Sequence, residues 1–218
     1  MDAAAAAESA RGDPAVEAFH RLFYDTHDTT WKQTFWLGVT VRKCAFDLWT
    51  YQEILVDTRP DLIVETGTYL GGSAFYLAGI CDLLGDGKIV TVDISAPPGR
   101  PRHRRIQYLQ GSSTDPGIVV RVARRARTAK RVMVVLDSNH SRDHVLRELE
   151  AYGPLVTPGC YLVVEDTNVN GNPVLPDHGP GPMEAVVEFL ATTDAFEVDR
   201  SRENRLLTFN PGGYLKRR

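Results

Sequence analysis

The chain has 218 residues, a length typical of one domain with a substantial core. Its formal net charge of −3 and its pI of about 6.1 give no general reason to expect binding to nucleic acid or to an anionic membrane surface. No apolar run reaches the roughly 20 residues that span a bilayer. The three cysteines, Cys44, Cys81 and Cys160, are isolated, which favours buried thiols in a reducing compartment over a disulfide framework or a zinc site. We therefore expect a cytoplasmic protein.

The N-terminal quarter of the chain divides into two expected parts. Residues 1–13 are rich in alanine and predict a disordered tail, whereas residues 14–57 predict a helical, aromatic-rich segment that packs on a core formed by residues 58–218. Helical spacing is clearest in residues 47–56. Packing against the edge of a sheet is the simplest interpretation for most of these aromatic side chains. Residues 29–41 are less regular and could instead form the wall of a binding site.

Residues 61–73 hold the most informative pattern: a short apolar run, a carboxylate, a glycine-rich turn and the start of a helix. The apolar run predicts a buried strand, Glu65 ends it, and Ser73 is a candidate N-cap for a helix at 74–84. Glycines let a ligand approach the backbone of such a turn closely, and the helix N-terminus offers free N–H groups. An ordinary tight turn between a strand and a helix would have the same pattern.

The spacing of the glycines favours one class of ligand. A dinucleotide-binding fold uses G-x-G-x-x-G, whereas this turn has Glu65 followed by Gly67, Gly71 and Gly72. A carboxylate at this point would repel a pyrophosphate but could hold an ammonium group. S-adenosylmethionine, which has an amino-acid end and a ribose end, suits this turn better than a dinucleotide does.

The next two expected strands carry further candidate cofactor contacts. Residues 88–93 predict a strand that ends in Asp93, at the place where ribose hydroxyls would be bound. Residues 106–110 predict another strand, followed by a loop of hydroxyl side chains that includes Ser113. That loop could contact an adenine edge, or it could simply cap the helix expected at 118–129 through Asp115.

Acidic residues follow the next two strands at the point where each strand ends. An apolar strand runs into Asp137, with His140 three residues on, and the strand at 160–164 ends in Glu165 and Asp166. These strands are neighbours in a doubly wound sheet, so the three carboxylates would share one edge. That arrangement is costly unless a cation neutralises it. An all-oxygen ligand set favours Mg2+, with Ca2+ or Mn2+ as alternatives, over zinc. Three unrelated surface acids are the weaker interpretation.

The C-terminal part adds a loop and the closing strands. Residues 167–183 are rich in proline and glycine and lie at the same edge, so His178, Asn168 and Asn170 are either substrate contacts or turn residues. A helix at 184–190 and an antiparallel hairpin of strands at 196–199 and 206–209 complete the domain. Strands that alternate with helices and end in a hairpin predict an α/β fold with a seven-stranded, mostly parallel sheet.

Four segments of the chain resemble the cephalosporin hydroxylase family: DLWTYQEILVDTRPDLIVETGTYLGGSA, VLDSNH, VVEDTNVNGNPVLPDHGPGPMEAV and LLTFNPGGYLKR. The resemblance covers nearly all of the chain from about Trp36 onward. It implies an S-adenosylmethionine-dependent, Mg2+-associated O-methyltransferase of natural products, antibiotics among them, or of sugars. It also implies a Rossmann-like, class I methyltransferase fold with helices on both faces of the sheet, and Mg2+ ligands at Asp137, Glu165 and Asp166.

The pattern is also similar to that of catechol-type O-methyltransferases. Their motif E-x-G-x-Y-x-G-x-S contributes cofactor contacts and is matched here by Glu65, Gly67, Tyr69, Gly71 and Ser73. This resemblance assigns Asp93 to the ribose, Ser113 to the adenine side, and Asp137 to both the cofactor side and the metal. The catalytic lysine of that family falls on His140. The sequence departs from the pattern there, and we expect His140 to be the general base, with Asp137 beside it in the catalytic group. The alternatives are that His144 or His178 is the base and that His140 only caps the following helix or orients Asp137.

Two hypotheses of function follow. The leading one is methyl transfer from S-adenosylmethionine to a hydroxyl of a small acceptor, a sugar or a polyketide-like molecule, by a homo-oligomeric enzyme. The alternative is a cofactor-binding accessory subunit of an oxidative, methoxylating complex that transfers no methyl group by itself. Product formed by the purified chain alone would separate the two. An NAD-linked oxidoreductase is disfavoured by the glycine spacing.

Overall fold

Seven strands form one sheet within residues 12–218, the part of the chain that this computed structural model describes. The predicted tail at 1–13 lies almost wholly outside the described residues. The strands follow the order β5-β4-β3-β6-β7-β9-β8. Their bounds are Leu62–Thr66 for β3, Lys88–Asp93 for β4, Ile106–Gln110 for β5, Val132–Leu136 for β6, Tyr161–Val164 for β7, Phe196–Val198 for β8 and Tyr214–Arg217 for β9. β3 to β7 are parallel and β9 is antiparallel to both neighbours, so the predicted mostly parallel sheet is confirmed.

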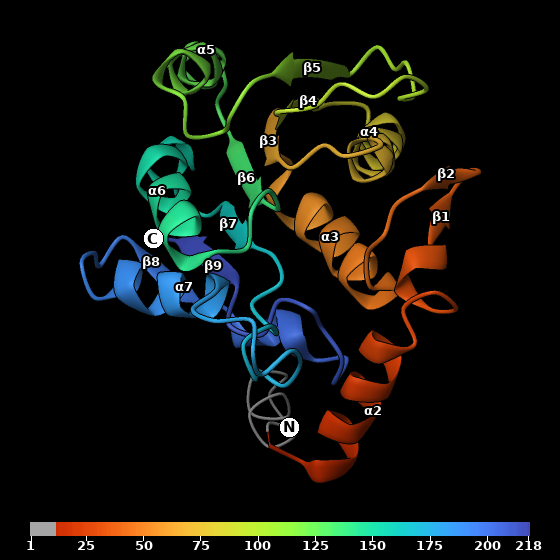
Figure 1. The fold of residues 1–218 in the computed structure, drawn as a ribbon. Coiled ribbons are helices and arrows are strands. Elements are labelled where there is room, and N and C mark those ends of the chain that lie inside the picture. The colour runs from red at the N-terminus through yellow and green to blue at the C-terminus, as the bar shows by residue number, and fades with distance from the viewer. Residues whose placement is uncertain (1–11) are drawn as a thin grey trace.

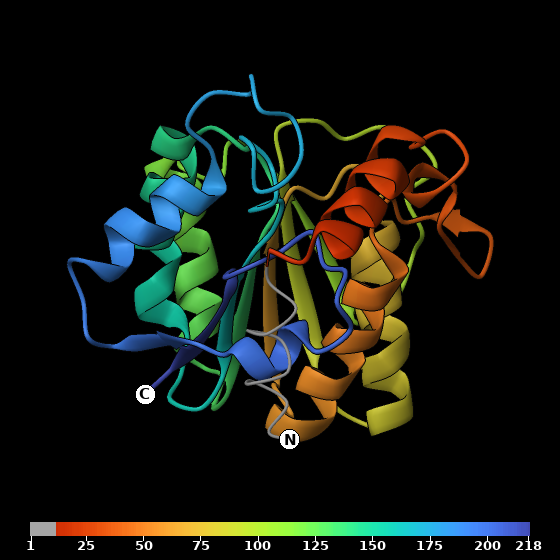
Figure 2. The same cartoon turned by 90° about the horizontal axis from the view of Figure 1, so that it is seen from below.

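Helices cover both faces of this sheet (Figures 1 and 2). One face carries α5 (Pro116–Ala126), α6 (Arg142–Tyr152) and α7 (Pro182–Leu190), and the other carries α3 (Ala45–Thr58) and α4 (Gly72–Leu84). The first described helix, α2 (Pro14–Asp25), lies beyond α3. Five short elements complete the chain: η1 (Trp31–Gln33), β1 (Phe35–Trp36), β2 (Val39–Thr40), η2 (Gly153–Leu155) and η3 (Arg200–Glu203).

The continuous apolar strands are explained by burial on both faces. In β6, Val132, Val134 and Leu136 pack against the α5–α7 layer, whereas Met133 and Val135 pack against α3 and α4. The three cysteines are free and buried, as predicted. No helix within residues 12–218 combines the length and the apolar character needed to cross a membrane.

The closing hairpin is antiparallel as predicted, but the predicted strand at 206–209 is wrong, because the second strand is β9. Residues 206–209 are held by side chains instead. The Asp47 carboxylate accepts hydrogen bonds from Thr208 Oγ1 at 2.5 Å and from the Phe209 N–H at 2.9 Å. The Phe209 ring packs among those of Tyr24 and Trp31. Side-chain partners have therefore taken the place of a strand neighbour here.

Candidate active site

Two glycines bring separate segments together at the carboxyl-terminal edge of the sheet. Gly67, directly after β3, has a φ of +85°, and a Cβ there would lie 1.6 Å from the carbonyl oxygen of Asp137. A Cβ at Gly72 would lie 2.0 Å from the Thr40 carbonyl oxygen. Only glycine allows approaches this close. Because α4 begins at Gly72 with Gly71 as its N-cap, the N-cap predicted at Ser73 is wrong, and Ser73 lies in the first turn.

Asp93, at the end of β4, anchors the same turn. Its Oδ2 accepts a hydrogen bond from the Tyr69 N–H at 2.7 Å, and its Oδ1 accepts two from the N–H and the hydroxyl of Ser95, both at 2.8 Å. Nη2 of Arg100 lies 3.6 Å from Oδ2. The carboxylate is thus held beside the glycine turn, where a ribose contact is expected.

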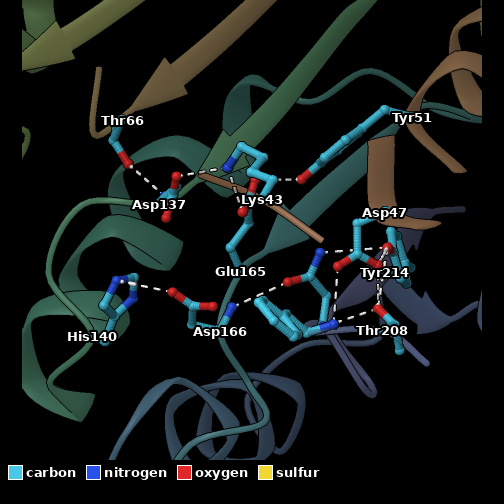
Figure 3. A network of polar contacts seen from close by, with 12 residues as sticks. Lys43, Asp47, Tyr51, Thr66, Asp137, His140, Glu165, Asp166, Thr208 and Tyr214 are labelled. Carbon is cyan, nitrogen blue, oxygen red and sulfur yellow. Dashed lines mark hydrogen bonds and ion pairs between the residues drawn. The ribbon is translucent and has the colours of Figure 1, made fainter. Parts of the chain in front are cut away.

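The three predicted carboxylates lie close together beyond β6 and β7 (Figure 3). Leu136 and Val164 are paired in these parallel strands, so Asp137 and Glu165 follow at the same level of the sheet. Lys43 joins them, because its Nζ donates to Asp137 Oδ2 at 2.7 Å and to Glu165 Oε2 at 2.5 Å. The Tyr51 hydroxyl donates to Glu165 Oε1 at 2.6 Å. Burial raises the pKa of both carboxyl groups, and the Lys43 charge counteracts it.

Asp166 and His140 form the other half of the site. His140 Nε2 lies 3.1 Å from Asp166 Oδ2. Burial lowers the pKa of His140, but the carboxylates around it, Asp166 first among them, outweigh this and leave that pKa raised. One ligand atom from each of Asp137, His140 and Asp166 lies within 4.8 Å of the others. Two carboxylates at this range are the hard oxygen donors that Mg2+ prefers, so the residues fit the ion.

A cleft of about 360 Å³ opens along these residues, a volume in the range of small-ligand sites. One side of the cleft is lined by seven predicted site residues: Gly67, Tyr69, Ser73, Asp93, Asp137, His140 and Asp166. The N-terminal segment supplies further lining residues: Tyr24, Trp31, Thr40, Val41 and Arg42. Residues within 29–41 therefore contribute to the wall of this cleft, together with Tyr24 and Arg42.

Three predicted cofactor contacts, Glu65, Gly71 and Ser113, lie outside the cleft lining, and so does the predicted metal ligand Glu165. Glu65 is fully buried, its Oε2 accepts a hydrogen bond from the Thr91 hydroxyl at 2.5 Å, and burial raises its pKa to about 7. Ser113 is buried, with its Oγ 3.1 Å from His144 Nε2. Asp115 accepts hydrogen bonds from the first N–H groups of α5, so it caps that helix as the loop pattern suggested. A direct cofactor contact of Glu65 or Ser113 remains a prediction.

The three candidate substrate contacts are placed differently from one another. Asn170 is half-buried, and its amide donates to Glu184 Oε1 at 3.0 Å. Asn168 is fully buried, and its amide donates to His20 Nε2 at 3.0 Å. His178 is exposed on the loop between β7 and α7. A Cβ built at Gly181 would lie 3.4 Å from the His140 carbonyl oxygen and 3.5 Å from His178 Nδ1, so His178 lies near the site. Geometry therefore favours His178 over Asn168 as a substrate contact.

No spacing or motif in the sequence predicts the part played by Lys43. This residue lies just before α3 and is only 5% exposed, and the fold alone brings it to the ends of β6 and β7. The one available signal is electrostatic, because several buried carboxylates require a buried cation. Burial lowers the pKa of Lys43, but Asp137 and Glu165 outweigh burial and leave that pKa raised.

Comparisons of sequence with known proteins give a consistent result. The family model described as "Rhamnosyl O-methyltransferase/CmcI" matches residues 28–218. A rhamnosyl O-methyltransferase of Mycobacterium tuberculosis is 40% identical over 212 residues, which cover 94% of this chain and 86% of the relative. The rhamnosyl O-methyltransferase of Mycobacterium leprae is 37% identical, with 94% and 92% covered.

Solved structures share the fold. An apo structure of CmcI has a TM-score of 0.65 at 21% identity, and the match covers 85% of this chain and 76% of that one. A CmcI structure with Mg and SAM has a TM-score of 0.63 at 20% identity, with 86% and 77% covered. At this level of identity the likeness concerns the fold alone.

Proposed function

The chain belongs to the rhamnosyl O-methyltransferase/CmcI family, and we propose that it is an S-adenosylmethionine-dependent, Mg2+-using O-methyltransferase that acts on a sugar hydroxyl. One observation carries this proposal: residues of the glycine turn, Asp93, Asp137, His140 and Asp166 all line a single cleft. The names of the curated relatives support a rhamnose-like deoxysugar as the acceptor. The reported Mg and SAM of CmcI agree with this choice of cofactors.

In this proposal each part of the cleft has its own role in binding or catalysis. The turn from Gly67 to Ser73 would hold the methionine end of S-adenosylmethionine, the methyl donor, and Asp93 would hold its ribose. Asp137, Glu165 and Asp166 would hold Mg2+, which when bound supplies a Lewis acid for the acceptor hydroxyl. Both Glu165 oxygens are already bonded, but each carboxylate oxygen keeps a second lone pair. His140 would take the proton of the acceptor hydroxyl, and S-adenosylmethionine when bound would supply the methyl group and leave as S-adenosylhomocysteine.

We infer two further properties of the enzyme. The three free, buried cysteines support work in a reducing, cytoplasmic compartment. Large exposed apolar side chains, such as Leu37 and Trp49, support a homo-oligomer. A small-molecule acceptor requires no nucleic acid or membrane partner.

The deciding experiment uses the purified chain alone. It is incubated with S-adenosylmethionine labelled in the methyl group and with rhamnose-bearing acceptors, in the presence of Mg2+ or of excess chelator. We expect labelled acceptor only with Mg2+, and its loss on chelation should be reversed by added Mg2+. Product that forms only after addition of a partner protein would favour the accessory-subunit alternative, and full turnover in chelator would reject the metal role.

A further inference from the structure

Lys43 occupies the centre of the acidic group (Figure 3). Its side chain is 5% exposed, and it contacts one carboxylate from the end of β6 and one from the end of β7. Lys43 Nζ lies within 2.7 Å of an oxygen of each carboxylate, so no water molecule separates the ammonium group from them. Fixing the long, flexible lysine side chain in this way loses considerable rotamer entropy. Electrostatic attraction must therefore offset that loss.

The attraction comes from the negative charges that surround Lys43. Asp137, Glu165 and Asp166 place three carboxylates at one edge, and the buried Glu65 also acts on Lys43 through space. His140 is paired with Asp166, on the other side of the group from Lys43 (Figure 3). Among the described residues, Lys43 is therefore the cation in direct contact with both Asp137 and Glu165.

The contacts also fix orientation. Glu165 has one oxygen on the Tyr51 hydroxyl and the other on Lys43, so its carboxylate cannot rotate without breaking a buried hydrogen bond. Asp137 offers Oδ2 to Lys43, and its backbone N–H donates to the Thr66 carbonyl oxygen at 3.1 Å. The carboxylates are thus held in place before any ion arrives, which lowers the cost of reorganising a metal site.

We propose that Lys43 is a positioning residue that acts as a built-in counter-cation of the metal site: it orients Asp137 and Glu165 without the ion, and its charge limits the affinity for the ion. This inference rests on the proposed function, in which those carboxylates hold Mg2+. A positive charge beside a divalent ion repels it strongly in a buried site. The expected consequence is a stable metal-free protein in which Mg2+ exchanges readily.

The test uses Lys43→Met, which keeps most of the length of the side chain and removes its charge, and Lys43→Arg, which keeps the charge. Mg2+ alone is titrated by calorimetry at pH 8, and thermal unfolding is followed with Mg2+ and with chelator. Without the ion, we expect Lys43→Met to unfold at a lower temperature than the wild type. Its Mg2+ affinity should be at least about tenfold higher, and Mg2+ should raise its unfolding temperature more. Lys43→Arg should resemble the wild type in its response to Mg2+.

An unchanged or weaker Mg2+ affinity in a folded Lys43→Met protein would overturn the proposal. If Lys43→Met does not fold, Glu165→Gln is compared with the double variant Lys43→Met/Glu165→Gln, which retains the overall charge of the wild-type site. We expect the double variant to bind Mg2+ at least about tenfold more tightly than Glu165→Gln. Equal Mg2+ affinities in this pair of variants would also overturn the proposal. If Lys43 were only structural, its replacement would lower the unfolding temperature by the same amount with Mg2+ and with chelator.

Methyl transfer by the wild type is measured separately, so that the role of Lys43 and the proposed function can be rejected independently. If the wild type methylates its acceptor while the Mg2+ affinities of the variants do not change, only the role of Lys43 is rejected. If the Mg2+ affinities follow the expected order while the wild type neither binds S-adenosylmethionine nor forms product, only the proposed function is rejected.

Discussion

At the scale of single residues, the protonation of His140 depends strongly on the charged groups around it. Its Nε2 lies 3.1 Å from Asp166, and the surrounding carboxylates raise its pKa despite burial. Only a neutral imidazole can accept a proton, so those carboxylates on their own oppose its use as a base. A divalent ion between Asp137 and Asp166 would offset their charge. Metal and base are therefore coupled in the proposed mechanism.

We predict that His140→Gln lowers kcat by a factor on the order of 10²–10⁴, because the base is lost, with little change in the affinities for cofactor and Mg2+. Steady-state kinetics and calorimetry measure these quantities in parallel. His103→Gln is the matched control, because His103 pairs with Asp82 of α4 and does not line the cleft, and it should keep nearly full activity. Wild-type turnover in His140→Gln, or metal loss in proportion to activity, would show that His140 is not the base.

At the scale of elements, the turn after β3 shows why a glycine there is required by its surroundings and not by backbone conformation alone. Gly67 and Gly85 have the same φ of +85°. A Cβ at Gly67 would collide with the Asp137 carbonyl oxygen at 1.6 Å, whereas a Cβ at Gly85 would meet no atom within 4 Å.

Gly85→Ala should therefore cost only the backbone strain of about 1–2 kcal/mol. Gly67→Ala must also push β6 away from the turn, and we expect a loss of more than about 4 kcal/mol or failure to fold. Urea denaturation followed by circular dichroism compares the two variants. Similar losses in both would mean that the turn can move away from β6 at little cost.

The helix α2 packs on the core through His20, whose imidazole is neutral in these contacts. His20 is 5% exposed, stacks on Phe209 with ring centroids 5.7 Å apart, and accepts a hydrogen bond from the Asn168 amide. Burial, with a smaller effect of Arg21, lowers its pKa from 6.5 to about 4. Because the unfolded chain takes up a proton first as the pH falls, acid favours unfolding at this position.

We predict that His20 costs the wild type roughly 3 kcal/mol of stability as the pH falls from about 6.5 to about 4. His20→Gln, which has no group that titrates in this range, should lose less stability over the same interval. Chemical denaturation of both proteins at several pH values gives the difference. A difference between the two that does not change with pH would mean that His20 is protonated in the folded protein without penalty.

The same elements show what the sequence can predict and what it cannot. Asp137, Glu165 and Asp166 follow apolar strands directly, so strand pattern and parallel topology suffice to bring them to one edge. Family resemblance added the O-methyltransferase class, which the match over residues 28–218 confirms. The strand predicted at 206–209 failed because Asp47, about 160 residues away in sequence, holds that segment. Lys43 was missed for a similar reason, since its partners lie 94 and 122 residues further along.

At the scale of the whole molecule, several large apolar side chains remain uncovered in the single chain. Leu37, in the turn between β1 and β2, is 78% exposed, and Phe35 in β1 is 53% exposed. Both views show this hairpin projecting from the side of the molecule (Figures 1 and 2). A projecting apolar turn is typical of a surface that is covered in an assembly.

We predict that the protein is at least a dimer and that the turn at Leu37 is part of the contact. Leu37 has a φ of +47°, and asparagine tolerates this conformation, so Leu37→Asn removes apolar surface without straining the turn. Leu83→Asn is the matched control, because Leu83 is 82% exposed but lies near the C-terminal end of α4 and not in the hairpin itself. Sedimentation at micromolar protein should give an oligomer of the 24.2 kDa chain for the wild type and for Leu83→Asn, and a smaller species for Leu37→Asn. A wild type that sediments at 24.2 kDa would contradict the assembly, and an unchanged oligomer in Leu37→Asn would place the contact elsewhere.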